Sequence, residues 1–210
     1  MARPLAHLDP RDPTPWPHPA CLAHKDILKQ CRIGRGRAGG PGGQNRNKVE
    51  TLVIITHLPS GLEAHAGERR SQGENKTVAL RRLRLLLATR LRVDPPPPPR
   101  GLDALLTPGG ACSALWRSRR RSVGGSGGRG GGGGGGGGGG RIACNPDHRD
   151  YPSLLAEALD VIASCGWEPA PAARRLDVTT SQLIGLVRDH PPALLAWNAA
   201  RAERGMHSLK

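Results

Sequence analysis

The chain has 210 residues, of which 30 are glycine and 20 are proline, so less than the full length can form packed elements. It contains no Phe, one Tyr and four Trp, and a core built from Leu, Ile, Val and Ala favours small helix-containing units over an aromatic-rich sandwich. The net charge of +14 is uneven: residues 1–145 carry 24 Lys and Arg against 9 Asp and Glu, whereas residues 146–210 carry 7 against 8. A balance of +15 in the first part, against −1 in the second, predicts a polyanion partner such as nucleic acid for the first part.

The cysteines and the N-terminus exclude several classes of protein. Five cysteines show no C-x-x-C spacing and their number is odd, which argues against a disulfide framework or a zinc module; they are Cys21, Cys31, Cys112, Cys144 and Cys165. We expect neither a metal ion nor a cofactor. The N-terminus lacks the apolar region of a signal peptide, and no stretch reaches the roughly 20 apolar residues of a membrane span. A cytoplasmic protein without a membrane partner is predicted.

Residues 1–20 are interrupted by prolines and predict a disordered leader. The segment AHKDILKQCRI that follows predicts a short helical turn leading into a strand around residues 30–35. VETLVIITHL, residues 49–58, is dense in β-branched side chains and predicts a second strand. A turn at 59–61 and the alternating segment LEAHA complete a β-hairpin.

A helix is predicted after this hairpin. Ser71 and Glu74 have the spacing of a capping box, in which each side chain satisfies a free backbone amide at the helix start. Leucines recur at helical spacing beyond it, and Asp94 before five prolines is expected to end the helix. The predicted core of this part of the chain comprises Val49, Leu52, Ile54, Leu62, Leu80, Leu83 and Leu87.

The segment GGPGGQNRNK, residues 39–48, joins the first predicted strand to the hairpin. It has two interpretations: a flexible loop in a chain with much glycine, or a loop shaped to enter a crowded nucleic-acid cavity. A phosphate-binding loop is excluded, because Gly43 is followed by Gln44 where that motif requires Gly-Lys-Ser/Thr.

Residues 95–141, with a proline run, the basic stretch LWRSRRR and a glycine tract, predict a linker. Residues 142–210 predict an all-α module in which two short helices flank a tight turn with the packing spacing of a helix-turn-helix. Three interpretations of this module remain open. A docking surface is favoured, DNA binding comes second because the second helix carries only Arg188 against Asp189, and a ribosomal contact comes third.

Three motifs occur in a fixed order between residues 24 and 92: RAGGPGGQNRNKVET, THLPSG and ERRSQGENKTVALRRLR. Together they resemble the catalytic domain of class I peptide chain release factors and their short stalled-ribosome rescue relatives. The resemblance implies an α+β fold with a small β-β-β/α catalytic domain over residues 21–94. It also implies that the glycine-rich loop enters the peptidyl transferase centre of the ribosome, where water attacks the ester of P-site peptidyl-tRNA.

The resemblance assigns candidate site residues. The catalytic candidates are Gly42, Gly43 and Gln44, and the candidates for ribosomal RNA contacts are Arg35, Arg37, Arg46, Lys48, Arg69 and Arg70. The expected partners are the large-subunit RNA and P-site peptidyl-tRNA, and no partner is assigned to the C-terminal module. Because no codon-recognition segment is visible in the 210 residues, codon-independent release is expected. The alternative is a non-catalytic RNA- or DNA-binding regulator that retains this domain as a binding unit.

Overall fold

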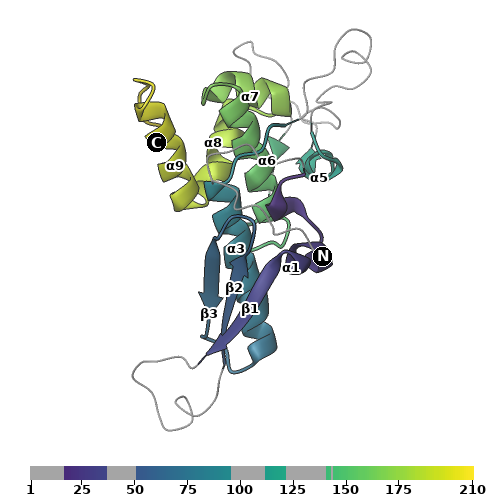
Figure 1. The fold of residues 1–210 in the computed structure, drawn as a ribbon. Coiled ribbons are helices and arrows are strands. Elements are labelled where there is room, and N and C mark those ends of the chain that lie inside the picture. The colour runs from purple at the N-terminus through teal and green to yellow at the C-terminus, as the bar shows by residue number, and fades with distance from the viewer. Residues whose placement is uncertain (1–16, 37–50, 96–111, 122–140, 143) are drawn as a thin grey trace, which may run out of the picture. The chain divides into compact units, whose positions relative to one another are not determined.

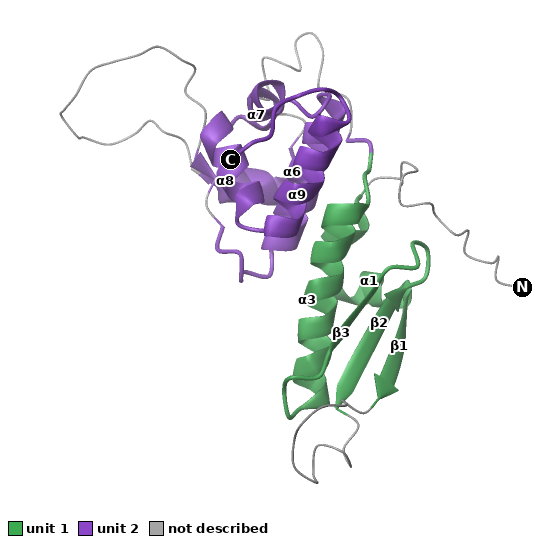
Figure 2. Ribbon diagram, turned by 90° about the vertical axis from the view of Figure 1, so that its left-hand side faces the viewer, with its two compact units in different colours: residues 1–93 green, residues 94–210 purple. Residues whose placement is uncertain are grey.

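The computed structural model describes residues 17–36, 51–95, 112–121, 141–142 and 144–210. The chain divides into two compact units, residues 1–93 (unit 1) and 94–210 (unit 2), shown in green and purple in Figure 2. Among the described residues, no helix combines the length and the apolar character that crossing a membrane requires.

Unit 1 is a three-stranded antiparallel sheet in the order β1-β2-β3, with one long helix packed on β2 and β3 (Figure 1). Its elements are the 3-10 helix η1 (Pro19–Cys21), α1 (His24–Lys29), β1 (Cys31–Gly36), β2 (Leu52–His57), β3 (Glu63–Ala66) and α3 (Gln72–Arg90). The predicted short helix, strand, hairpin and long helix are all present. The α+β class is confirmed.

The strand residues that face the core differ from the prediction by one position. Leu52 and Ile54 were predicted to be buried, but both are half-exposed, and the sheet buries Val53 and Ile55 under α3 instead. Successive strand residues point to opposite faces, so a shift of one position exchanges the two faces. The run LVIIT is apolar or β-branched on both faces, and its sequence therefore does not reveal which set is inside. Leu62 is also half-exposed, and Val49 lies outside the described residues.

The long helix α3 confirms the predicted leucine stripe, because Leu80, Leu83 and Leu87 are buried. Its start after Ser71 agrees with the prediction, but the capping contacts do not. Ser71 is the N-cap residue, but its side chain makes no capping hydrogen bond, so the predicted capping box with Glu74 is wrong. The helix ends at Arg90, four residues before Asp94.

Unit 2 is mainly helical. Its elements are α5 (Ala114–Arg119), the short strands β4 (Arg120–Arg121) and β5 (Arg141–Ile142), and the helices α6 (Tyr151–Ser164), α7 (Pro169–Leu176), α8 (Thr180–Arg188) and α9 (Pro191–Ala202). Helix α6 is buried along nearly its whole length, from Tyr151 to Ile162, and α7 and α8 pack against it. The predicted helices of the C-terminal part are present.

Residues 112–121 differ from the predicted linker, because they fold as part of unit 2. The Trp116 side chain is fully buried and its indole N–H donates to the Leu176 carbonyl at 3.0 Å. Ser113 donates through its backbone N–H and its hydroxyl to the two Glu157 carboxylate oxygens, both at 2.6 Å. Burial raises the pKa of Glu157, and the two bonds from Ser113 oppose that rise. The buried Trp116 and the bonds of Ser113 thus anchor a basic, Ser- and Arg-rich stretch to unit 2.

Candidate functional site

One end of unit 1 gathers the ends of four elements. The antiparallel ladder pairs Gly36, the last residue of β1, with Leu52, the first residue of β2. It also pairs Val53 with Ala66, so β3 ends there, and α3 begins there (Figure 1). The segment 37–50 therefore leaves and re-enters the sheet at this end, which we call the loop end. The predicted residues of this segment lie outside the described residues: Arg37, Gly42, Gly43, Gln44, Arg46 and Lys48.

The other three predicted site residues are described, and all three have exposed side chains at the loop end. Arg35 lies one residue before the end of β1, opposite Val53 in the ladder. Arg69 and Arg70 lie in the connection between β3 and α3. Exposed arginines near the anchor points of residues 37–50 fit contacts with nucleic-acid phosphates.

A buried asparagine that the sequence analysis did not single out fixes this end. Asn75, in the first turn of α3, is fully buried. Its Nδ2 donates to the carbonyl oxygens of Thr51 at 2.7 Å and Arg69 at 2.9 Å, and its Oδ1 accepts from the Arg69 backbone N–H at 2.9 Å. One side chain thus joins three segments: the start of α3, the arginine-bearing connection, and the residue at which the chain returns from 37–50.

The sequence does contain a signal for Asn75. The residue lies four, eight and twelve positions before Ala79, Leu83 and Leu87, which form the buried stripe of α3. A polar side chain on an apolar stripe must find hydrogen-bond partners inside the protein. An asparagine in that position therefore indicates a buried junction.

A cavity of about 500 Å³ opens beside this junction, lined by Ile33, Arg35, Val53, Gln72, Gly73 and Lys76. Its lining includes two cations and no carboxylate, and it lies at the N-terminus of α3, where the helix dipole also favours negative charge. Lys76 was not among the predicted site residues. The cavity brings it together with Arg35, although the two residues are 41 positions apart in the sequence.

Two other arginines of α3, Arg82 and Arg84, bond to groups within unit 1. Arg82 pairs with Glu68 and donates to the His65 carbonyl at 2.8 Å. Arg84 donates to the Leu22 carbonyl at 2.6 Å. Side chains committed to backbone carbonyls inside unit 1 are poor candidates for contacts with RNA.

The opposite end of the sheet carries a neutral histidine cluster. His57 is fully buried, its Nδ1 lies 2.7 Å from the Ser60 hydroxyl, and its Nε2 lies 3.1 Å from Gln30 Oε1. Burial lowers the pKa of His57 to about 4. His18 is also fully buried, and burial, aided by the Arg92 charge, lowers its pKa to about 3. Both rings are uncharged at neutral pH and hold the turn after β2 and the N-terminal segment.

Comparison with known proteins finds one family model whose match lies almost entirely in unit 1. Residues 27–96, about a third of the chain, match the family model described as RF-1 domain. This segment contains the sheet, helix α3, the loop end and the GGQ sequence at 42–44.

Three relatives illustrate the similarity. The chain is 61% identical over 51 residues to the chloroplastic peptide chain release factor PrfB1 of Arabidopsis thaliana. These 51 residues are 24% of this chain and 11% of that protein. It is 56% identical over 63 residues to peptide chain release factor 1 of Chlorobaculum tepidum, covering 30% of this chain and 16% of the relative. It is 36% identical over 100 residues to peptide chain release factor 2 of Mycobacterium tuberculosis, covering 47% and 25%. The chain thus spans a quarter or less of the length of these relatives.

Proposed function

We propose that this protein is a ribosome-dependent hydrolase of the peptidyl-tRNA ester. The observation that carries the proposal is the RF-1 domain match, which includes the GGQ sequence. The loop end supports it, because exposed cations lie where the chain enters and leaves the segment that bears this sequence. A positively charged base under a glycine-rich segment suits insertion into a cavity made of RNA.

In this proposal Gly42 and Gly43 supply backbone shapes that other residues adopt only with strain, and they let RNA approach without a Cβ in the way. Gln44 offers its backbone N–H to the negative charge that develops on the reacting ester oxygens. Its side chain positions the water and excludes larger nucleophiles. Residues 37–50 contain no His or Asp, and the single Glu50 lies six positions beyond Gln44, so we assign the remaining proton transfers to RNA groups.

The cations of unit 1 anchor the domain in the proposed complex. Arg35 and Lys76 line one cavity, and we propose that they share a single phosphate or adjacent phosphates of ribosomal RNA. Arg69 and Arg70 extend this contact along the connection to α3, and Arg37, Arg46 and Lys48 extend it into the loop. Such contacts fix position without selecting a base sequence.

We further propose that release does not depend on the codon in the ribosomal A site. The test measures peptide release from purified ribosomes that carry a stop codon, a sense codon or an empty A site. Similar rates in the three cases are expected. A requirement for a stop codon would contradict codon independence, and absence of release in all three would contradict hydrolysis itself.

A further inference from the structure

The helices α7 and α8 are joined by a turn of three residues with a defined geometry. Asp177 ends α7 in the left-handed region, with φ 52° and ψ 49°. Val178 is buried next to it, and Thr179 is the N-cap of α8, its hydroxyl accepting from the Gln182 backbone N–H at 3.2 Å. Two short helices joined by such a turn form the helix-turn-helix motif, in which the second helix is the one that enters the DNA major groove.

Buried side chains on the inner faces hold this pair in place. Both helices pack on α6 and on each other. The residues that bury this contact are Ala172, Ala173 and Leu176 of α7, and Leu183, Leu186 and Val187 of α8. The Tyr151 hydroxyl, from the start of α6, donates to the Leu186 carbonyl at 2.8 Å and ties α8 down near its C-terminal end. The outer face of α8 is thus presented on a rigid support.

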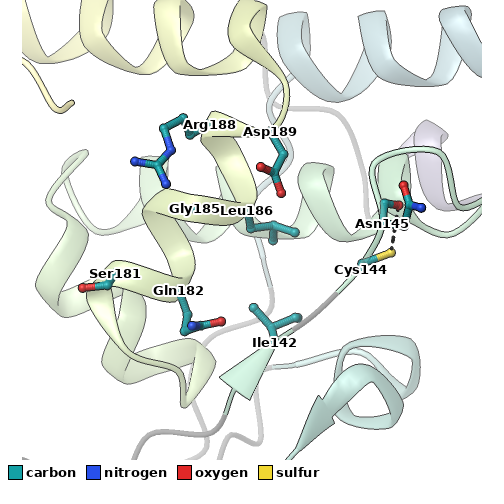
Figure 3. Close-up of a pocket in the computed structure, with 9 residues that line it drawn as sticks. All are labelled: Ile142, Cys144, Asn145, Ser181, Gln182, Gly185, Leu186, Arg188 and Asp189. Carbon is teal, nitrogen blue, oxygen red and sulfur yellow. Dashed lines mark hydrogen bonds between the residues drawn. The ribbon is translucent and has the colours of Figure 1, made fainter.

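The outer face of α8 is polar and borders a groove. A cavity of about 500 Å³ runs between α8 and the segment around β5, lined by Ile142, Cys144, Asn145, Ser181, Gln182, Gly185, Leu186, Arg188 and Asp189. Ser181 and Arg188 are exposed. Figure 3 shows Gln182 on the side of α8 nearer Ile142, whereas Arg188 points away from that segment. Helix α8 therefore offers an amide and a hydroxyl near its N-terminus, and the cation of Arg188 beside the exposed carboxylate of Asp189 at its C-terminal end.

Packing of residues 112–121 into unit 2 changes the net charge of this unit. Residues 146–210 alone carry 7 cations against 8 carboxylates, a balance of −1. Over residues 112–121 and 141–210, the count is 12 Lys and Arg against the same 8 carboxylates, a balance of +4. Arg120 pairs with Asp177 at the turn between α7 and α8, and Arg119 pairs with Asp150 at 2.5 Å. The arginines of α5 and β4 thereby neutralise carboxylates that would repel a polyanion.

We propose that α8 binds in the major groove of B-form DNA, with Ser181 and Gln182 facing base edges and Arg188 contacting a phosphate. The second helix of a helix-turn-helix contacts bases through its N-terminal residues, and a glutamine amide can pair with adenine through two hydrogen bonds. The major groove of B-form DNA, about 12 Å wide, admits a helix, whereas the deep, narrow major groove of A-form RNA does not. The occupant of this face is therefore DNA rather than duplex RNA.

The experiment uses the full chain, because unit 1 is basic and also attracts nucleic acid. Random-sequence DNA duplexes a few helical turns long are selected for binding in the presence of heparin, and the enriched sequences are compared with the starting pool. Enrichment of a defined sequence is expected. Affinity for that sequence is then measured against the unselected pool and against an RNA duplex of the same sequence, at several stated salt concentrations.

Two variants separate base contacts from phosphate contacts. Gln182→Ala should reduce affinity for the selected sequence about tenfold and leave affinity for the unselected pool unchanged. Arg188→Ala should weaken binding to both, and should lower the slope of log affinity against log salt by about one. Arg204→Ala, which removes one exposed charge after α9, is the matched control and should leave the preference for the selected sequence intact.

Three results would overturn the proposal: no enriched sequence, equal affinity for the RNA duplex, or an unchanged preference in Gln182→Ala. Peptide release is measured on the same variants and should equal that of the unsubstituted protein. The DNA inference and the proposed hydrolase function are thus tested by separate readouts, and either can fail alone.

Discussion

Asn75 is expected to control the rate of peptide release without touching the ester. Its side chain holds the Thr51 carbonyl and both backbone groups of Arg69, so it ties Thr51, the first described residue after 37–50, and the arginine-bearing connection to α3. Replacing it with aspartate keeps the shape and the oxygen that accepts from Arg69. The substitution also replaces Nδ2, which donates to the carbonyl oxygens of Thr51 and Arg69, with an oxygen. Two hydrogen bonds are thereby replaced by repulsion between oxygen atoms.

The magnitude follows from the three bonds, since each typically contributes about 1 kcal/mol to folding stability. Asn75→Ala should therefore lower the stability of unit 1 by about 3 kcal/mol, offset by about 0.6 kcal/mol from the higher helix propensity of alanine. Asn75→Asp should cost at least as much, because two buried carbonyls lose their donor and face a negative charge. Release should slow by about tenfold to a hundredfold, as expected when a reacting group is displaced by about an ångström.

The assay is single-turnover peptide release at saturating protein, beside a ribosome-binding measurement at the same salt. Leu87→Ala is the matched control: it should destabilise unit 1 by about 2–5 kcal/mol through a cavity on the same helix, twelve residues or about 18 Å from Asn75. At temperatures where all variants remain folded, Leu87→Ala should release peptide normally. Equal rates in the Asn75 variants and in the control would refute the anchoring argument, whereas loss of release in the unsubstituted protein would refute the proposed function instead.

Three further outcomes are expected. Gly43→Ala should nearly abolish release while ribosome binding persists, and Gln44→Ala, which keeps the backbone donor, should retain part of the hydrolysis with poorer discrimination against hydroxylamine; single-turnover release measures both. From pH 8 to pH 5 the free energy of unfolding of unit 1 should fall by about 2 kcal/mol through His57, because its pKa of about 4 in the folded state lies below the ordinary 6.5 and only the unfolded ring gains a proton. His18 contributes in the same direction. An NMR titration in which the His57 ring has an ordinary pKa would contradict the His57 contribution. Trp116→Ala should destabilise unit 2 by about 3–5 kcal/mol in chemical denaturation, whereas Arg117→Ala at the next, exposed position should have little effect.

The sequence predicted the elements of unit 1 well because local signals agreed there. Leucines at helical spacing, β-branched runs and a turn at 59–61 correspond to α3, β2 and the hairpin. It did not predict which face of β2 is buried, because β-branched residues occupy both faces. The predicted capping box was wrong although Ser71 and Glu74 have the right spacing. The side chain that bonds at the start of α3 is that of Asn75, and one of its partners, Thr51, lies 24 positions away in the sequence.

The linker prediction for residues 112–121 depended on composition. Its arginines and serines resemble those of the glycine tract beyond, and the packing of Trp116 against α7 and the bonds of Ser113 to Glu157 are contacts over 44 to 60 positions. Arg69 and Arg70 were candidates because the motif ERRSQGENKTVALRRLR contains them, and their role as RNA contacts stays a prediction. Lys76 lines the same cavity as Arg35 because the tertiary fold brings the start of α3 to the loop end of the sheet, which the sequence alone does not reveal.

Net charge alone overstates how many cations can bind a polyanion. Arg84 donates to a main-chain carbonyl within unit 1, as Arg92 does to the carbonyls of Ala88 and Thr89. In unit 2, Arg119 and Arg120 pair with carboxylates. Arg35, Arg69, Arg70 and Lys76 lie at the loop end of unit 1, whereas Lys25, Arg32 and Arg90 are exposed elsewhere on the unit. The four cations at the loop end lie beside the positions where the chain leaves the sheet at Gly36 and returns at Leu52. Under the proposed function they, rather than the exposed cations elsewhere on unit 1, are expected to make most of the contacts with RNA.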